Sequence, residues 1–191
     1  MAYSGIKTTD VLLEEALRTA EELGRPLRYV QLNSFYNGST GSIMRGLHSQ
    51  LSSSGVDSYC FWGRRHETIS DHMACCASRS EVYLHGAMTR LFDRMGFYSK
   101  HDTNRLLARL DEIDPDVVHL HNIHGYYVNI EMLFSWLASH RCQVRWTLHD
   151  CWALTGHCAY FTYAECVQWQ SHCAYSKPCP QLDTYPKTIC K

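Results

Sequence analysis

Imidazole and carboxylate side chains follow two apolar segments in the second half of the chain. His121 ends the run VVHLH, and His149 and Asp150 end the run QVRWTLHD. An imidazole can act as a general base or position a hydroxyl group, and a carboxylate can orient an imidazole. These three residues are therefore the candidate catalytic residues, although capping of a strand end by hydrogen bonding explains His121 equally well. We expect His119 to point to the opposite face of its strand from His121.

A turn-rich loop early in the chain could hold an anion. It consists of Asn37, Gly38, Ser39, Thr40 and Gly41, and a predicted helix follows it. Glycine lets the backbone approach a ligand closely, and the first turn of a helix offers unpaired N–H groups. We take these five residues as the candidate cofactor-binding segment. The loop is not a G-x-G-x-x-G motif, and a short glycine turn can also serve packing alone.

Cysteines gather in the last forty or so residues, which hold six of the ten in the chain. The candidate metal ligands among them are Cys158, Cys166, Cys173 and Cys179. Four thiolates, or three with a neighbouring imidazole from His157 or His172, could close a tetrahedral structural zinc site. The alternative is that these cysteines are small apolar residues of a tight loop. The sequence patterns of catalytic zinc sites, such as H-E-x-x-H, are absent.

Apolar periodicity predicts that helices and strands alternate along the chain. The predicted helices span residues 9–23, 43–51, 84–95, 104–113 and 129–139, and the predicted strands span 27–32, 56–62, 117–121 and 143–148. This alternation favours an α/β, Rossmann-like parallel sheet with helices on both faces. Ligands of such sheets bind at the carboxyl ends of the strands, where the candidate residues fall. After Asp150 the regular pattern gives way to an irregular cysteine-rich segment.

Length and charge limit the organisation of the chain and its partners. The 191 residues suffice for one domain, which we divide into a helical extension (1–26), a Rossmann-like part (27–150) and a cysteine-rich segment (151–191). Eighteen basic and nineteen acidic residues give a net charge of -1, so no global positive field attracts the chain to nucleic acid or to an anionic membrane. The sequence has no signal peptide and no apolar run long enough to span a membrane, so we expect a cytoplasmic protein. Peripheral contact with the inner membrane stays open.

Three segments of the chain resemble the family 4 glycosyltransferases of bacterial exopolysaccharide and colanic-acid-type pathways. They are QLNSFYNGSTGSIMRGLH (31–48), DPDVVHLHNIHGYYVNIEMLF (114–134) and VRWTLHDCWALTGHCAYFTYAECVQW (144–169). The resemblance runs from about residue 27 to the end and includes CPQLDTYP (179–186). The run HDCWALTGHC is its most specific part.

The resemblance implies a GT-B fold, in which two Rossmann-like domains face a cleft. Members of the family transfer a sugar, commonly a hexose, from a nucleotide donor to a glycan or lipid-linked acceptor. The loop Gly38 to Gly41 would then face the donor phosphates, His121 would lie beside the transferred sugar, and His149 would line the acceptor side. Retaining enzymes of this fold need no metal for transfer, so zinc in the cysteine-rich segment would be structural.

The resemblance covers only the amino-terminal, acceptor-side domain of such an enzyme. The carboxy-terminal domain grips the donor, and the chain stops at Lys191 without it. We therefore expect a fragment that is inactive alone and regains transfer when that domain is supplied, in the same chain or as another gene product. One competing interpretation is a non-catalytic Rossmann-like module that binds a glycan or a protein and is held together by structural zinc. Another is a truncated gene whose product has no activity.

Overall fold

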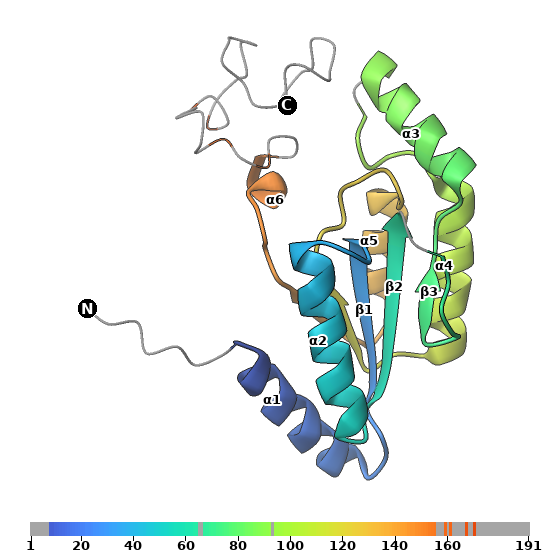
Figure 1. Ribbon diagram of the computed structural model, residues 1–191. Coiled ribbons are helices and arrows are strands. Elements are labelled where there is room, and N and C mark those ends of the chain that lie inside the picture. The colour runs from blue at the N-terminus through green and yellow to red at the C-terminus, as the bar shows by residue number, and fades with distance from the viewer. Residues whose placement is uncertain are drawn as a thin grey trace.

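Helices and strands alternate along most of the chain. The computed structural model describes residues 8–64, 67–92 and 94–155, together with residues 159, 161, 167 and 170 (Figure 1). In chain order the elements are α1 (Thr8–Leu23), β1 (Arg28–Phe35), α2 (Ser39–Ser53), β2 (Asp57–Arg64), β3 (Met73–Cys75), α3 (Arg79–Phe92), α4 (Lys100–Ile113), β4 (Val117–Leu120), α5 (Ile130–Ser139), β5 (Gln143–Trp146) and α6 (Trp152–Thr155).

The strands form one sheet in the order β3-β2-β1-β4-β5, and every neighbouring pair runs parallel. The chain first extends the sheet on one side of β1 and then crosses to the other side to form β4 and β5. The strand order therefore reverses between β1 and β4, which is where open α/β sheets bind ligands. The predicted Rossmann-like fold is confirmed.

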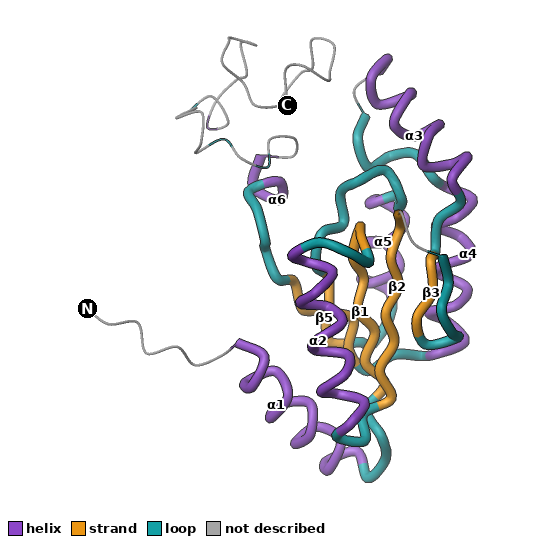
Figure 2. The backbone as a smooth tube through the Cα atoms, in the orientation of Figure 1, coloured by secondary structure: helices purple, strands orange, loops and turns teal. Residues whose placement is uncertain are grey.

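Helices cover both faces of the sheet, as predicted. Val30 and Val118 point to the face on which α4 and α5 pack, and Tyr29 and Val117 point to the face of α1 and α2. Figure 2 shows α2 in front of the sheet and α5 behind it. Alternate residues of a strand point to opposite faces, so the two cores draw on alternate positions of the same strands.

The amino-terminal helix packs on the sheet. Ala16 of α1 is buried in the same cluster as Leu47 of α2 and Tyr29 of β1. Glu15 of α1 also forms an ion pair with Arg145 of β5, with 2.6 Å between the carboxylate and guanidinium groups. The helix that stands outside the family resemblance therefore contributes to the core and to the edge of the sheet.

Several elements differ from the sequence-based prediction. Strand β3 was not predicted, because it has only three residues and all of them are half buried. Strand β1 continues to Phe35 through polar residues that we expected in a loop, and α3 begins at Arg79 rather than at residue 84. The polar first turn of α3 carries no periodic apolar signal, but Ser78 Oγ accepts the Glu81 N–H there.

Candidate functional site

Two of the three candidate catalytic residues are in contact at the carboxyl edge of the sheet. His121 follows β4 and His149 follows β5, and the His121 Nδ1 and His149 Nε2 atoms lie 3.0 Å apart. Their rings are nearly parallel, with centroids 5.2 Å apart. Strands β4 and β5 are neighbours, so their carboxyl ends bring together residues 28 positions apart in sequence.

His119 lies on the same face as His121, so our expectation that they point to opposite faces is wrong. Residues two apart in a strand share a face, and the two ring centroids are 4.2 Å apart. The pairing register sets His119 opposite Gln31 of β1 and Arg145 of β5. His119 Nδ1 lies 2.9 Å from the Tyr29 hydroxyl group, so the face carries a row of polar contacts across the central strands.

The hydrogen bonds around His121 fix the direction in which protons are donated. The His121 Nε2 atom is 3.1 Å from Gln31 Oε1, which can only accept, while Gln31 Nε2 donates to Cys60 Sγ. A neutral His121 therefore donates from Nε2 and accepts at Nδ1, and the donor to Nδ1 is the Nε2–H group of His149. In a neutral His149 the other ring nitrogen, Nδ1, then carries the free lone pair.

Burial keeps both rings neutral near pH 7. His121 is only 1% exposed, and burial, with smaller contributions from His119 and His149, lowers its pKa to about 2. Burial also lowers the pKa of the half-buried His149, against a small opposing effect of Asp150. His149 is thus the ring that a ligand can reach, and His121 is the residue that positions it.

Asp150 contacts His124 instead of its neighbour His149. Its Oδ2 atom lies 2.8 Å from His124 Nε2, and its Oδ1 atom accepts the Trp152 N–H group that opens α6. Burial raises the pKa of Asp150, but the hydrogen bonds from His124 and Trp152 outweigh it and hold the pKa below its ordinary value. The candidate site therefore holds two pairs, His121 with His149 and His124 with Asp150.

The candidate anion-binding segment runs from the turn after β1 into α2, with Gly38 as the N-cap of that helix. Ser39, Thr40 and Gly41 form its first turn, so α2 begins earlier than the predicted residue 43. The φ of 90° at Gly38 lies in the region that favours glycine. A Cβ atom at Gly41 would lie 2.1 Å from the Tyr36 carbonyl oxygen, so any larger residue at this position would clash with the backbone of Tyr36. The N–H groups of Ser39, Thr40 and Gly41 belong to the first turn and have no acceptor within the helix. Asn37 is exposed beside them.

Asn33 ties this loop to the histidine-bearing strand end. Its Nδ2 group donates to the Phe35 carbonyl at 2.8 Å and to Thr40 Oγ1 at 3.2 Å. Its Oδ1 atom accepts the Asn122 N–H group at 3.2 Å. Asn33 is fully buried, at the point where the strand order reverses.

Sequence reasoning missed Gln31, Asn33 and His124 as residues of the site. Gln31 stands inside the apparently apolar strand LRYVQL, and Asn33 was placed in a loop. His124 stands three residues after His121 but was not among the candidate residues. The signal that could have found Gln31 is a single polar residue inside a buried strand, because such a residue must find a hydrogen-bond partner.

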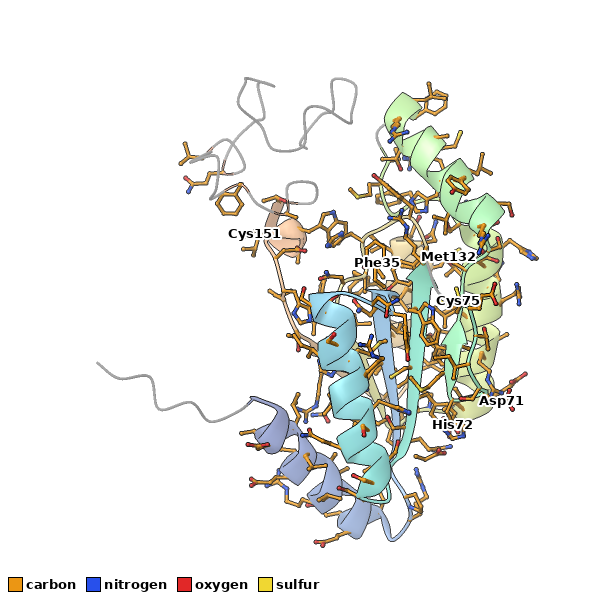
Figure 3. All side chains as sticks on the ribbon, viewed as in Figure 1. Phe35, Asp71, His72, Cys75, Met132 and Cys151 are labelled. Carbon is orange, nitrogen blue, oxygen red and sulfur yellow. The ribbon has the colours of Figure 1, made fainter. Side chains whose placement is uncertain are left out.

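Cavities along the carboxyl edge differ greatly in size. The cavity at the histidine pairs measures only about 10 Å³. A cavity of about 770 Å³ lies at the ends of β2 and β3, lined in part by Arg64, Cys75, Arg79 and Tyr83. In Figure 3, Phe35 and Cys75 lie toward this edge, and Asp71 and His72 lie at the opposite end of the sheet. A ligand at His149 would therefore lie on the surface of the sheet edge.

The predicted metal ligands Cys158, Cys166, Cys173 and Cys179 lie outside the described residues. Within the described part of the chain, no group of three or more histidine, cysteine or acidic side chains could hold a metal ion. Among those residues there is also no helix that is long and apolar enough to cross a membrane.

Comparison with known proteins gives one clear similarity. Over 105 residues, which are 52% of this chain, the sequence is 35% identical to a protein of Escherichia coli (strain K12) described as "Putative colanic acid biosynthesis glycosyl transferase WcaC". The matched stretch spans 24% of the length of that relative. No known protein family matches the chain by its sequence profile. No solved structure matches it.

Proposed function

We propose that this chain is the acceptor-side domain of a GT-B glycosyltransferase. The enzyme would transfer a hexose from a nucleotide-sugar donor to a glycan or lipid-linked acceptor in the synthesis of a cell-surface polysaccharide. The similarity to a colanic acid glycosyltransferase supports the class of reaction. The observation that carries the proposal is the His121–His149 pair beside the point where the strand order reverses.

In this proposal the two ends of the site have different tasks. The segment Asn37 to Gly41 faces the donor phosphates, and the first-turn N–H groups of Ser39, Thr40 and Gly41 point to them, because a helix N-terminus attracts negative charge. His149 accepts a hydrogen bond from the acceptor hydroxyl group at its free Nδ1 atom, and His121 holds the ring of His149 in place. The His124–Asp150 pair fixes the turn that follows β5.

A second domain completes the proposed enzyme. The leaving nucleoside diphosphate needs cationic or N–H groups that stabilise its charge, and we assign these to the carboxy-terminal domain of a GT-B pair. No metal is required for transfer in this proposal. The protein would act in the cytoplasm, at the inner membrane if its acceptor is lipid-linked.

Restoring the second domain tests this proposal. The chain is co-expressed with, or fused to, the carboxy-terminal part of the E. coli relative, and release of nucleoside diphosphate is measured with a panel of nucleotide sugars and acceptor extracts. We expect sugar transfer, and His149→Ala should lower the rate by about 10² to 10⁴, the usual contribution of a positioned acid or base. His140→Ala, a change to a partly exposed histidine after α5, is the matched control. If the folded pair transfers no sugar from any donor, the enzyme proposal is abandoned.

A second candidate function is a glycan- or protein-binding module without turnover. The full engagement of both His121 nitrogens by protein groups is compatible with a purely structural ring. In this case Cys158, Cys166, Cys173 and Cys179 would hold a structural zinc ion. One zinc per chain by native mass spectrometry, together with glycan binding and no donor hydrolysis in the restored protein, would favour the module.

A further inference from the structure

Helix α3 carries a stripe of large apolar side chains on its outer side. Tyr83, Leu84, Leu91 and Phe92 are 77%, 60%, 72% and 61% exposed. Leu84, Met88 and Leu91 are three or four residues apart, so they share one side of the helix. Tyr83 and Phe92 lie at the two margins of that side. Four large apolar side chains exposed on one short helix form a patch of the kind that marks an interaction site.

The inner side of α3 packs on the domain and carries two buried polar residues. His85 is fully buried, with its Nδ1 atom 2.8 Å from Ser99 Oγ and its Nε2 atom accepting the Gly96 N–H group at 3.0 Å. Thr89, one turn further on, is also fully buried. A surface helix ordinarily turns its larger apolar side chains inward. On the inner side of α3, Val82 packs against the core and His85 is hydrogen-bonded, whereas the larger apolar side chains point outward. The core therefore does not account for the outer stripe.

Arginines border the apolar stripe. Arg79 and Arg90 lie eleven residues apart on α3, which is close to three full turns, so they lie on the same side of the helix. Arg94 stands two residues after the end of α3. The acidic residue of the first turn, Glu81, accepts the Asp102 N–H group at the start of α4. Leucine and phenylalanine bordered by arginines are typical of helices that lie in the interface of an anionic membrane.

The position of α3 fits contact with a membrane-bound substrate. The helix stands beyond the carboxyl end of β2 (Figure 1), at the edge of the sheet that carries the candidate site. Arg79, Val82 and Tyr83 line the cavity of about 770 Å³ at the ends of β2 and β3. A bilayer in contact with the outer side of α3 would therefore lie next to the mouth of this cavity.

We propose that the outer side of α3 docks on the surface of an anionic lipid bilayer. The apolar side chains enter the boundary of the acyl chains, and the bordering arginines contact lipid phosphates. This inference rests on the proposed function and narrows it, because an enzyme docked in this way takes a lipid-linked acceptor rather than a soluble glycan.

The test is sedimentation of the 191-residue chain with vesicles. One set contains equal parts of phosphatidylglycerol and phosphatidylcholine, and the other contains phosphatidylcholine alone. We expect clear binding to the anionic vesicles and weak binding to the neutral ones. Leu84→Glu combined with Leu91→Glu should lower the partition coefficient about a hundredfold, since burying each leucine contributes about a factor of ten. Circular dichroism confirms that the variant is folded.

A matched variant carries the same added charge on another helix. Val11 and Leu23 of α1 are 40% and 44% exposed, and their replacement by glutamate adds two negative charges away from α3. This variant should bind anionic vesicles within about threefold of the unchanged chain, because the added charges are screened beyond about 10 Å. Equal loss of binding in both double variants would overturn the proposal. Absence of vesicle binding by the unchanged chain would also overturn it. So would a dimer of the unchanged chain that is lost in the α3 variant and kept in the α1 variant.

Vesicle binding needs neither donor nor second domain, so it is independent of the transfer assay. Sugar transfer to a soluble acceptor without vesicle binding would refute the docking surface and leave the proposed function intact. Vesicle binding by a restored protein that transfers no sugar would refute the proposed function, and with it the narrowing to a lipid-linked acceptor.

Discussion

Three buried histidines should make the stability of this protein fall steeply between pH 7 and pH 5. His85, His119 and His121 are at most 1% exposed, and burial is the main cause that lowers the pKa of each: to about 4, about 4 and about 2. In the unfolded chain a histidine has a pKa near 6.5. The unfolded state therefore takes up protons in this pH range and the folded state does not, so acidification favours unfolding.

The size of the effect follows from the unfolded state alone. Between pH 7 and pH 5, each histidine that stays neutral in the fold lowers the free energy of unfolding by about 1.8 kcal/mol. The three together remove roughly 5 kcal/mol, a large part of the roughly 5–15 kcal/mol that stabilises an ordinary domain. Carboxylates contribute little in this window. The pKa values of Asp116 and Asp150 lie below the ordinary 3.8, so their contribution is lost only at lower pH.

Urea unfolding of the 191-residue chain, followed by tryptophan fluorescence at pH 7, 6 and 5, measures this dependence. His119→Gln is the informative variant, because an amide can still hydrogen-bond to Tyr29 but does not titrate. It should reduce the pH dependence by about one third. A free energy of unfolding that is constant from pH 7 to pH 5 would refute the reasoning. So would a variant with the full pH dependence of the unchanged chain.

Packing and capping give further predictions. Gly63→Ala places a Cβ atom 2.0 Å from the Cβ and Cγ atoms of Tyr127. This clash should lower the free energy of unfolding by about 3 kcal/mol, measured by urea unfolding. Gly46→Ala on the open surface of α2 is the control and should raise it by about 0.5–1 kcal/mol; equal effects of the two changes would contradict the packing described here. Asn129→Ala removes the side chain that accepts the Met132 N–H group at the start of α5 and should cost about 1–2 kcal/mol. An unchanged midpoint of thermal unfolding would show that this cap contributes nothing.

The sequence was sufficient to predict the class of fold and to place the candidate residues His121 and His149 at the carboxyl edge of the sheet. Helices and strands with regular apolar spacing, such as residues 104–113 and 117–121, were predicted within a few residues. Strand β3 could not be predicted, because its three residues are held by pairing with Cys60, Phe61 and Trp62 of β2 and carry no pattern of their own.

The contacts between side chains of the candidate site could not be predicted from the sequence, for a related reason. Which residues face each other across parallel strands depends on register, and register is set by packing of the whole sheet. His121 and His149 were both proposed as site residues, but their contact follows from the alignment of β4 with β5. The same alignment brings Asp150 to His124.

The bonds of Asn33 connect the two parts of the candidate site. This buried side chain holds the first turn of α2 through Thr40 and the end of β4 through the Asn122 amide. An anion that draws the first turn of α2 toward itself must move Asn33 or break its bond to Thr40, and movement of Asn33 reaches the histidine-bearing strand end. Coupling of this kind is reciprocal. If a bound anion changes the affinity for an acceptor at the strand end by some factor, the bound acceptor must change the affinity for the anion by that same factor.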